Sequence, residues 1–187
     1  METKTLEETQ KINNALVIID AQEKIINAVE NKKVTLGNIF KLLKCYEILE
    51  KNIYITEQNP SKLGYTLPKL LPKVNYKKIE KMAFSFVDNK LIENEFHSKK
   101  IKNFIICGFE THICVQQSVL DLLVKGFNVY LVIDAMSTRN YIDHDIAIKR
   151  MLSKGATISS TESIIFELCK TSSRSEFKSI SNLIKEK

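Results

Sequence analysis

The chain has 187 residues, of which 44% are hydrophobic and only five are Gly and three Pro. This is enough for one domain with a substantial core, and it excludes the composition of a disordered or fibrous protein. The formal net charge of +6 would suit a nucleic-acid partner, but the lysines are spread along the chain without a basic run or interleaved aromatic residues. We therefore expect a Lys-rich solvated surface and no specific nucleic-acid partner.

The cysteines indicate a reducing compartment. None of them has CxxC spacing or a paired framework: Cys45, Cys107, Cys114 and Cys169. Residues 1–13 are polar and do not resemble a signal peptide, and no apolar run approaches the roughly 20 residues of a membrane span. These features predict a cytoplasmic protein with reduced thiols and no membrane partner.

Short apolar runs alternate with amphipathic segments within a single domain, residues 1–187, that begins with a flexible arm at 1–13. We expect strands at 15–20, 53–56, 76–79, 102–107, 128–133 and 157–160. We expect helices at 36–50, 88–98, 111–126, 141–154, 161–170 and 174–186. A loop at 59–75 holds all three prolines. The alternation predicts an α/β protein, a three-layer α/β/α sandwich of Rossmann-like type with a mostly parallel sheet.

Two charged residues follow predicted strands. Asp20 ends the apolar run 15–20, at the sheet edge where open α/β sheets bind ligands, although a helix N-cap is an alternative role. Lys81 precedes the apolar segment 82–84 and could be partly desolvated, which lowers the pKa of a lysine. The alternative for Lys81 is one surface lysine among many.

Cys114 follows the predicted strand 102–107. The residue types predict Thr111 as the N-cap of the helix 111–126 and Gly126 as its end. Cys114 would then lie in the first helical turn, where free backbone N–H groups and the helix dipole favour a thiolate. The alternative is a small buried core thiol. A dithiol couple with Cys107 is not expected, because the strand and the helix should direct the two side chains apart.

Three blocks together resemble the isochorismatase-like cysteine hydrolases: residues 15–23, Lys81 with 84–86, and 108–115. The resemblance covers about residues 13–180. Segments 56–58, 63–64 and 161–163 are similar to the isochorismatase domain-containing subgroup. The resemblance implies a six-stranded parallel sheet of order 3-2-1-4-5-6 and an Asp–Lys–Cys triad. Carried onto this chain, Cys114 would be the nucleophile, Asp20 the proton carrier, and Lys81 the cation that stabilises the thiolate and orients the acid.

The resemblance also implies features around the nucleophile. The backbone N–H groups of Cys114 and Ile113 would bind the oxyanion of a tetrahedral intermediate. A non-proline cis peptide bond would join Phe109 to Glu110. Further candidates, for contact with the substrate, are Gln22, Gln58, Phe84 and His112.

The sequence departs from two better-known groups of relatives. Nicotinamidases bind a metal through an acid and histidines after the second strand, whereas residues 56–60 here contain no histidine, so we expect neither a metal nor a cofactor. Isochorismatases proper lack the nucleophilic cysteine that this chain keeps.

The prediction is therefore a metal-independent hydrolase that cleaves a C–N, amide-type bond of a small molecule through a Cys thioester. The alternative is a non-catalytic small-molecule-binding or scaffold protein. A homo-oligomer, a dimer or larger, is expected by resemblance only.

Overall fold

The computed structural model describes residues 13–87 and 90–185. A six-stranded sheet with the order β3-β2-β1-β4-β5-β6 lies at its centre, and each neighbouring pair is parallel. The strands are β1 (Asn13–Ile19), β2 (Asn52–Gln58), β3 (Lys77–Lys81), β4 (Ile101–Phe109), β5 (Asn128–Ser137) and β6 (Thr157–Ser159). The predicted α/β class and strand order are confirmed.

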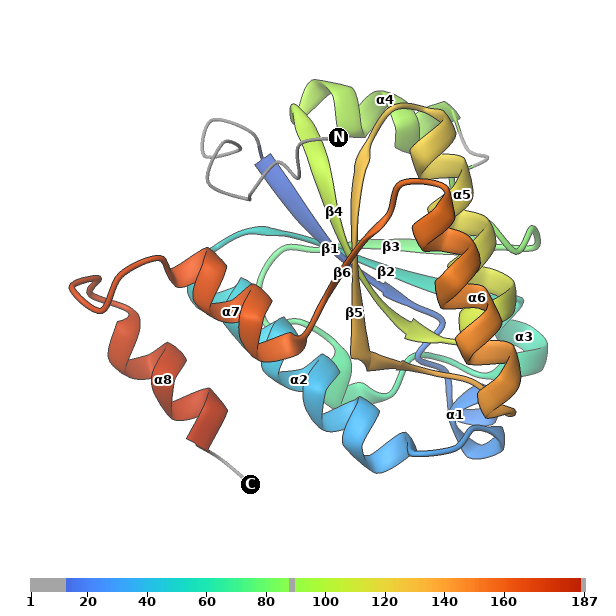
Figure 1. Ribbon diagram of the computed structural model, residues 1–187, viewed down its shortest axis with the longest axis horizontal. Helices are drawn as coiled ribbons and strands as arrows, with labels where there is room; N and C mark the ends of the chain where they lie inside the picture. Colours follow the sequence, from blue (N-terminus) through green and yellow to red (C-terminus); the bar gives the residue numbers. More distant parts are fainter. Residues whose placement is uncertain (1–12, 88–89, 186–187) are drawn as a thin grey trace.

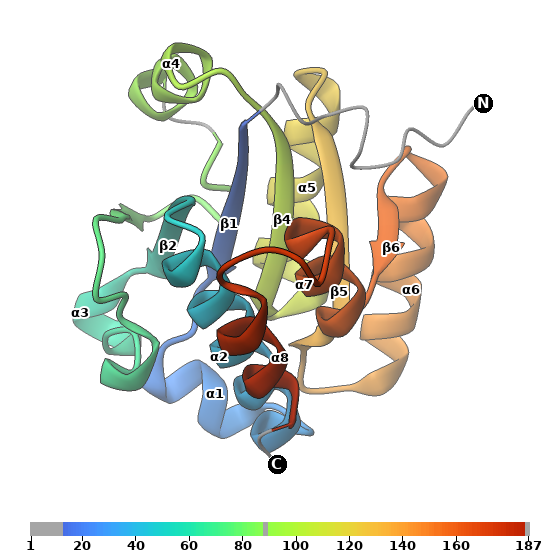
Figure 2. The same cartoon turned by 90° about the vertical axis from the view of Figure 1, so that its left-hand side faces the viewer.

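Helices cover both faces of the sheet (Figure 1). One face carries α2 (Lys32–Ile48), α7 (Thr161–Cys169) and α8 (Phe177–Lys185). The other carries α4 (Lys90–Ser98), α5 (Gln116–Val124) and α6 (Tyr141–Ser153). Figure 2 shows α8 lying outside α2 and α7, the outermost element of its layer. The three layers match the predicted sandwich.

The alternation of side chains along the strands creates two apolar cores. Leu16 and Ile18 of β1 point toward α2, whereas Val17 and Ile19 point toward the α4–α6 layer, and all four are fully buried. The central strands therefore read as continuous apolar runs, the pattern of a parallel sheet covered on both faces.

Gly108 allows the central strands to approach each other before the predicted nucleophile. It pairs with Ile19 in the β1–β4 register and has a φ of 131°. A Cβ atom at this position would collide with the backbone carbonyl oxygen of Ile19. Only glycine fits without displacing β1, so this residue determines how β4 delivers the chain to the carboxyl edge of the sheet.

The boundaries differ from the predicted ones mainly at that edge. β2 and β3 extend to Gln58 and Lys81, and β5 extends to Ser137 through an irregular register after Leu131. Two short helices, α1 (Glu23–Ala28) and α3 (Pro60–Leu63), and a 3-10 turn at Pro68–Leu70 occupy segments that were not predicted to be helical. Residues 1–12 of the expected arm lie outside the described part of the chain, and Asn13 already belongs to β1.

Candidate active site

Asp20 follows β1 directly and is completely buried. Its φ of 51° lies in the left-handed region, which is uncommon for a residue with a side chain and persists where surrounding contacts enforce it. The Thr56 hydroxyl donates a hydrogen bond of 2.6 Å to Asp20 Oδ1. The N-cap position of α1 belongs to Gln22, so the alternative that Asp20 caps this helix is wrong.

Lys81 is the last residue of β3, and only 5% of its side chain is exposed. Its Nζ atom lies 2.8 Å from Asp20 Oδ2 and 2.9 Å from Gln58 Oε1. The alternative of an ordinary surface lysine is therefore wrong. Removing two charges from water is costly unless they are paired and hydrogen-bonded, as these are.

Cys114 lies in a π-helical turn, Thr111–Val115, between β4 and α5, and its residue is only 4% exposed. Burial raises the pKa of the Cys114 thiol, and the nearby negative charge of Asp20 raises it further, while the Lys81 charge opposes both effects. These effects favour the neutral thiol. The thiolate expected from the helix start is not supported, because desolvation and the adjacent carboxylate both raise the thiol pKa.

The turn before Cys114 differs from the expected one. The described residues contain no cis peptide bond, so the bond between Phe109 and Glu110 is trans, and the chain reverses instead through Glu110, whose φ is 57°. Thr111 does not cap the helix; its hydroxyl donates to the Ser137 carbonyl oxygen over 3.1 Å. The Ile113 N–H donates to the Glu110 carbonyl oxygen over 2.9 Å, so this proposed oxyanion donor already has a partner.

A cavity of about 260 Å³ opens onto Cys114. Its lining combines aliphatic and aromatic side chains with a few charged ones: Lys24, Ile25, Ala28, Gln58, Leu63, Phe84, Glu110, Ile113, Cys114 and Arg139. Phe84 is 49% exposed, so its ring is available to a ligand. The predicted pocket residues Gln58 and Phe84 do line the cavity.

The other two predicted pocket residues do not line it. Gln22 is completely buried, and its amide is used by hydrogen bonds to the backbone of Gln58 and Gly64. The His112 ring lies 2.7 Å from the Thr138 hydroxyl, measured from Nδ1 to Oγ1. Both residues hold loops together at the carboxyl edge.

Sequence reasoning missed an ion pair at the mouth of the cavity. Arg139 donates to both carboxylate oxygens of Glu110, with distances of 3.1 Å from Nε and 3.3 Å from Nη2. This fork joins the loop after β5 to the residue that reverses the chain before Cys114. The one available signal was the position of Arg139 in a loop at the carboxyl edge of the sheet.

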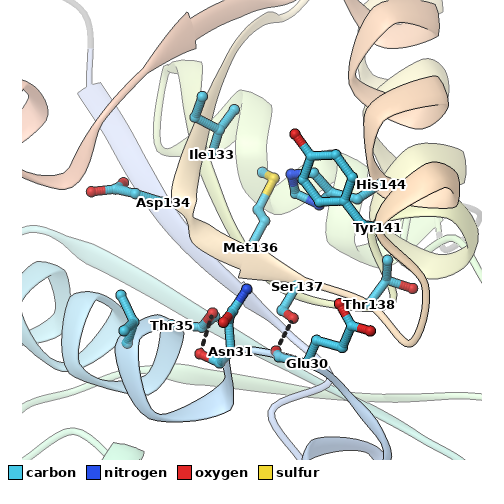
Figure 3. Close-up of a pocket in the computed structure, with 11 residues that line it drawn as sticks. Glu30, Asn31, Thr35, Ile133, Asp134, Met136, Ser137, Thr138, Tyr141 and His144 are labelled. Atoms are coloured by element: carbon cyan, nitrogen blue, oxygen red, sulfur yellow. Dashed lines mark hydrogen bonds between the residues drawn. The ribbon is translucent and has the colours of Figure 1, made fainter.

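A second hollow, of about 230 Å³, lies behind the same loop between the beginnings of α2 and α6. Figure 3 shows Met136 and the stacked rings of Tyr141 and His144 along one side, with the Asp134 carboxylate directed away. His144 Nδ1 lies 3.0 Å from the Thr111 hydroxyl oxygen, and burial lowers the pKa of this histidine. The hollow contains none of the predicted catalytic side chains.

Within residues 13–87 and 90–185, no three His, Cys, Asp or Glu side chains are grouped so that they could hold a metal ion. Among the same residues, no helix has the length and apolar character needed to cross a membrane. The four cysteines are all free and buried.

Comparison with known proteins gives a consistent result. The model of the isochorismatase domain matches residues 14–163. Isochorismatase family protein 1B of Dictyostelium discoideum is 36% identical over 93% of this chain and 87% of its own length. Human isochorismatase domain-containing protein 2 is 32% identical over 93% and 84%. A structure described as the MAR1 ribonuclease of Caenorhabditis elegans superimposes with a TM-score of 0.87, is 34% identical, and covers 92% of this chain and 90% of its own.

Proposed function

The chain belongs to the isochorismatase family, and we propose that it is a metal-independent cysteine hydrolase that cleaves a C–N, amide-type bond of a small molecule. One observation supports the proposal above all others. The Cys114 thiol lies at a cavity, close enough to the buried Asp20–Lys81 pair for both charges to act on its pKa. A nucleophile beside a proton acceptor and a fixed cation is the arrangement that acyl transfer requires.

The proposed reaction begins with a neutral thiol. As Cys114 Sγ attacks the amide carbonyl carbon, its proton passes to Asp20, so a free thiolate never has to form in the buried site. The Cys114 backbone N–H would bind the developing oxyanion. The Ile113 N–H would contribute only by sharing or releasing its bond to Glu110. Asp20 then gives the proton to the leaving nitrogen as the C–N bond breaks, leaving a thioester.

Water completes the cycle. Asp20 removes a proton from the water that attacks the thioester, the C–S bond breaks, and Cys114 recovers its proton while the acid product leaves. Lys81 keeps the Asp20 carboxylate oriented and balances its charge in both halves of the reaction. The step needs neither an oxidant nor a metal ion.

The cavity supports a small substrate. A volume of about 260 Å³ suits a compact molecule, and the Phe84 ring with Ile25 and Leu63 favours an apolar or flat body. A homo-oligomer and a cytoplasmic location stay predictions.

The alternative of a non-catalytic binding protein is tested by the same experiment. Ammonia or amine release would be measured across a library of small primary and secondary amides, with intact-mass detection of an acyl-enzyme. We expect turnover by the unmodified chain, none by Cys114→Ala, and full activity in Cys169→Ala, whose buried cysteine packs on the opposite face of the sheet. Binding of a library member without turnover would favour the binding protein.

Because one relative is described as a ribonuclease, single-stranded RNA belongs in the same screen. RNA cleavage by the unmodified chain and by Cys114→Ala alike would contradict the proposal, since the cysteine chemistry would then be irrelevant.

A further inference from the structure

We infer that Thr56 and Gln58, at the carboxyl end of β2, are positioning residues that hold the Asp20–Lys81 pair in its working orientation beside Cys114. The inference rests on the proposed function, but it assigns Gln58, a predicted substrate contact, a different role. Thr56 acts on the acid and Gln58 acts on the cation.

Thr56 holds both the side chain and the backbone of Asp20. Its hydroxyl donates 2.6 Å to Oδ1, and its carbonyl oxygen accepts the Asp20 N–H over 3.2 Å. Thr56 is fully buried, so water cannot replace the hydroxyl. The Asp20 N–H also donates to the Thr56 hydroxyl oxygen over 3.3 Å, and the three bonds support the left-handed backbone of Asp20 and leave Oδ2 for Lys81.

Gln58 holds Lys81 through an amide that is itself anchored. Its Oε1 accepts from Lys81 Nζ over 2.9 Å, while its Nε2 donates to the Met82 carbonyl oxygen over 2.8 Å. An ammonium has three N–H donors, so the bonds to Asp20 and Gln58 leave one. The orientation of that last donor is determined by the other two.

The Gln22 side chain fixes the backbone of Gln58 through two hydrogen bonds. The Gln22 side chain accepts from the Gln58 N–H over 2.7 Å and donates to the Gln58 carbonyl oxygen over 3.0 Å. It also donates to the Gly64 carbonyl oxygen over 2.6 Å. The amide thereby pairs with the last residue of β2, and it ties this end to Gly64, directly after the α3 residue Leu63 that lines the cavity.

Side chains alternate between the two faces of a strand, so Thr56 and Gln58 point to one side of β2 and Glu57 to the other. Thr56 and Gln58 are two positions apart and address the same buried pair. Glu57 between them accepts the Thr66 N–H over 2.8 Å instead. On one side, the carboxyl end of β2 therefore holds the Asp20–Lys81 pair. On the other side, it holds the segment that contains Thr66.

The first test removes the Thr56 hydroxyl. The rate constant of Cys114 alkylation by iodoacetamide would be measured against pH for Thr56→Val and Thr56→Ser. Without the donated hydrogen bond the Asp20 charge acts more strongly on the thiol, so Thr56→Val should react about three- to tenfold more slowly at a given pH. Thr56→Ser should react like the unmodified chain. Thr35→Val, at another buried threonine whose hydroxyl donates to the carbonyl oxygen of Asn31, the N-cap residue of its own helix, is the matched control.

The second test changes charge at constant shape. Gln58→Glu places a carboxylate beside Lys81, competes with Asp20 for it, and should slow alkylation by about tenfold. Gln117→Glu adds the same charge at an exposed position of α5 and should have little effect. The inference is overturned if the two glutamates act alike, or if Thr56→Ser is as slow as Thr56→Val.

Alkylation needs no substrate, so the two proposals can fail separately. Variants that alter thiol reactivity in a chain that hydrolyses no amide would support the positioning role and contradict the hydrolase. Unaltered reactivity in a chain that does hydrolyse amides would contradict the positioning role alone. With a substrate in hand, Thr56→Val should lower kcat by about tenfold and leave KM nearly unchanged, because the Thr56 hydroxyl bonds to Asp20 and Thr56 does not line the cavity.

Discussion

Lys81 Nζ lies 2.8 Å from Asp20 Oδ2, with 5% of the lysine side chain and none of the aspartate side chain exposed. The two residues are 61 positions apart in the chain and meet because β1 and β3 both end at the carboxyl edge of the sheet, on either side of β2. A pair this deeply buried is weak evidence for stability, since apolar residues often pack as well. The position of the pair beside the Cys114 thiol, which lines a cavity, explains the presence of two buried charges better than stability does.

Breaking the Asp20–Lys81 pair should destabilise the fold, and the losses from removing the two charges should not add. Lys81→Met leaves a buried carboxylate without its cation and should lower the free energy of unfolding by about 3–5 kcal/mol. The double variant Lys81→Met with Asp20→Asn should lose less than the sum of the two single variants. Urea unfolding followed by circular dichroism measures all three. Additive losses would mean that the two charges do not interact in the folded chain.

The reactivity of Cys114 should increase steadily with pH. Because burial and Asp20 raise the thiol pKa, alkylation should accelerate about tenfold for each pH unit above neutrality and show no plateau near the ordinary cysteine pKa of about 8.5. Stopped alkylation with peptide mass spectrometry measures the rate at this cysteine separately from the other three. A plateau below that pH would show that a thiolate is already stabilised in the free protein.

Charge variants should move that profile in opposite directions. Asp20→Asn removes the carboxylate that raises the thiol pKa, so alkylation at a given pH should become faster. Lys81→Met removes the charge that lowers it and should make alkylation slower. Shifts of the same sign in both variants would point to a general loosening of the site instead of the loss of individual charges.

Gly108 and Gly37 should respond oppositely to alanine. In Gly108→Ala the new Cβ would meet the Ile19 carbonyl oxygen, and separating β1 from β4 should cost about 3 kcal/mol or more. Gly37 lies within α2, and nothing would lie within 4 Å of its Cβ, so Gly37→Ala should stabilise the chain by about 0.5–1 kcal/mol. Chemical unfolding compares the two variants. A tolerated Gly108→Ala would mean that the central strands can shift at this point.

The parts of this structure that depend on local pattern could be predicted from the sequence. Apolar runs such as 15–19 and 104–107 indicate strands buried on both faces, and three sequence blocks indicated the group of Asp20, Lys81 and Cys114. Their burial and mutual approach agree with that prediction. Their catalytic roles stay a proposal.

The errors concern partners that are remote in sequence. Gln22 was expected in the pocket, but its amide meets Gln58, 36 positions away, through a register that no local pattern reveals. The thiolate expected at Cys114 rested on the helix start and on the Lys81 charge, and it omitted the desolvation that only a packed structure defines. The reversal at Glu110 likewise needs no cis bond, because a left-handed residue braced by Arg139 accomplishes it.

The Arg139–Glu110 ion pair leads to the last prediction. The guanidinium of Arg139 donates two bonds to Glu110, the residue directly before the π-helical turn of Cys114. In Arg139→Ala the turn loses this restraint, so amide hydrogen exchange across residues 110–115 should accelerate. The loss in unfolding free energy should be about 1 kcal/mol or less, because Arg139 is half exposed.

Two variants distinguish the effect of the two Arg139–Glu110 hydrogen bonds from the effect of the positive charge alone. Arg139→Lys keeps the positive charge but cannot donate two parallel bonds, so it should exchange nearly as fast as Arg139→Ala. Arg150→Ala removes an exposed arginine within α6 and should leave exchange at 110–115 unchanged. If lysine restored slow exchange, charge alone would suffice to hold the turn. If Arg150→Ala matched Arg139→Ala, the effect would reflect the overall charge of the molecule, and the fork would have no specific part in positioning Cys114.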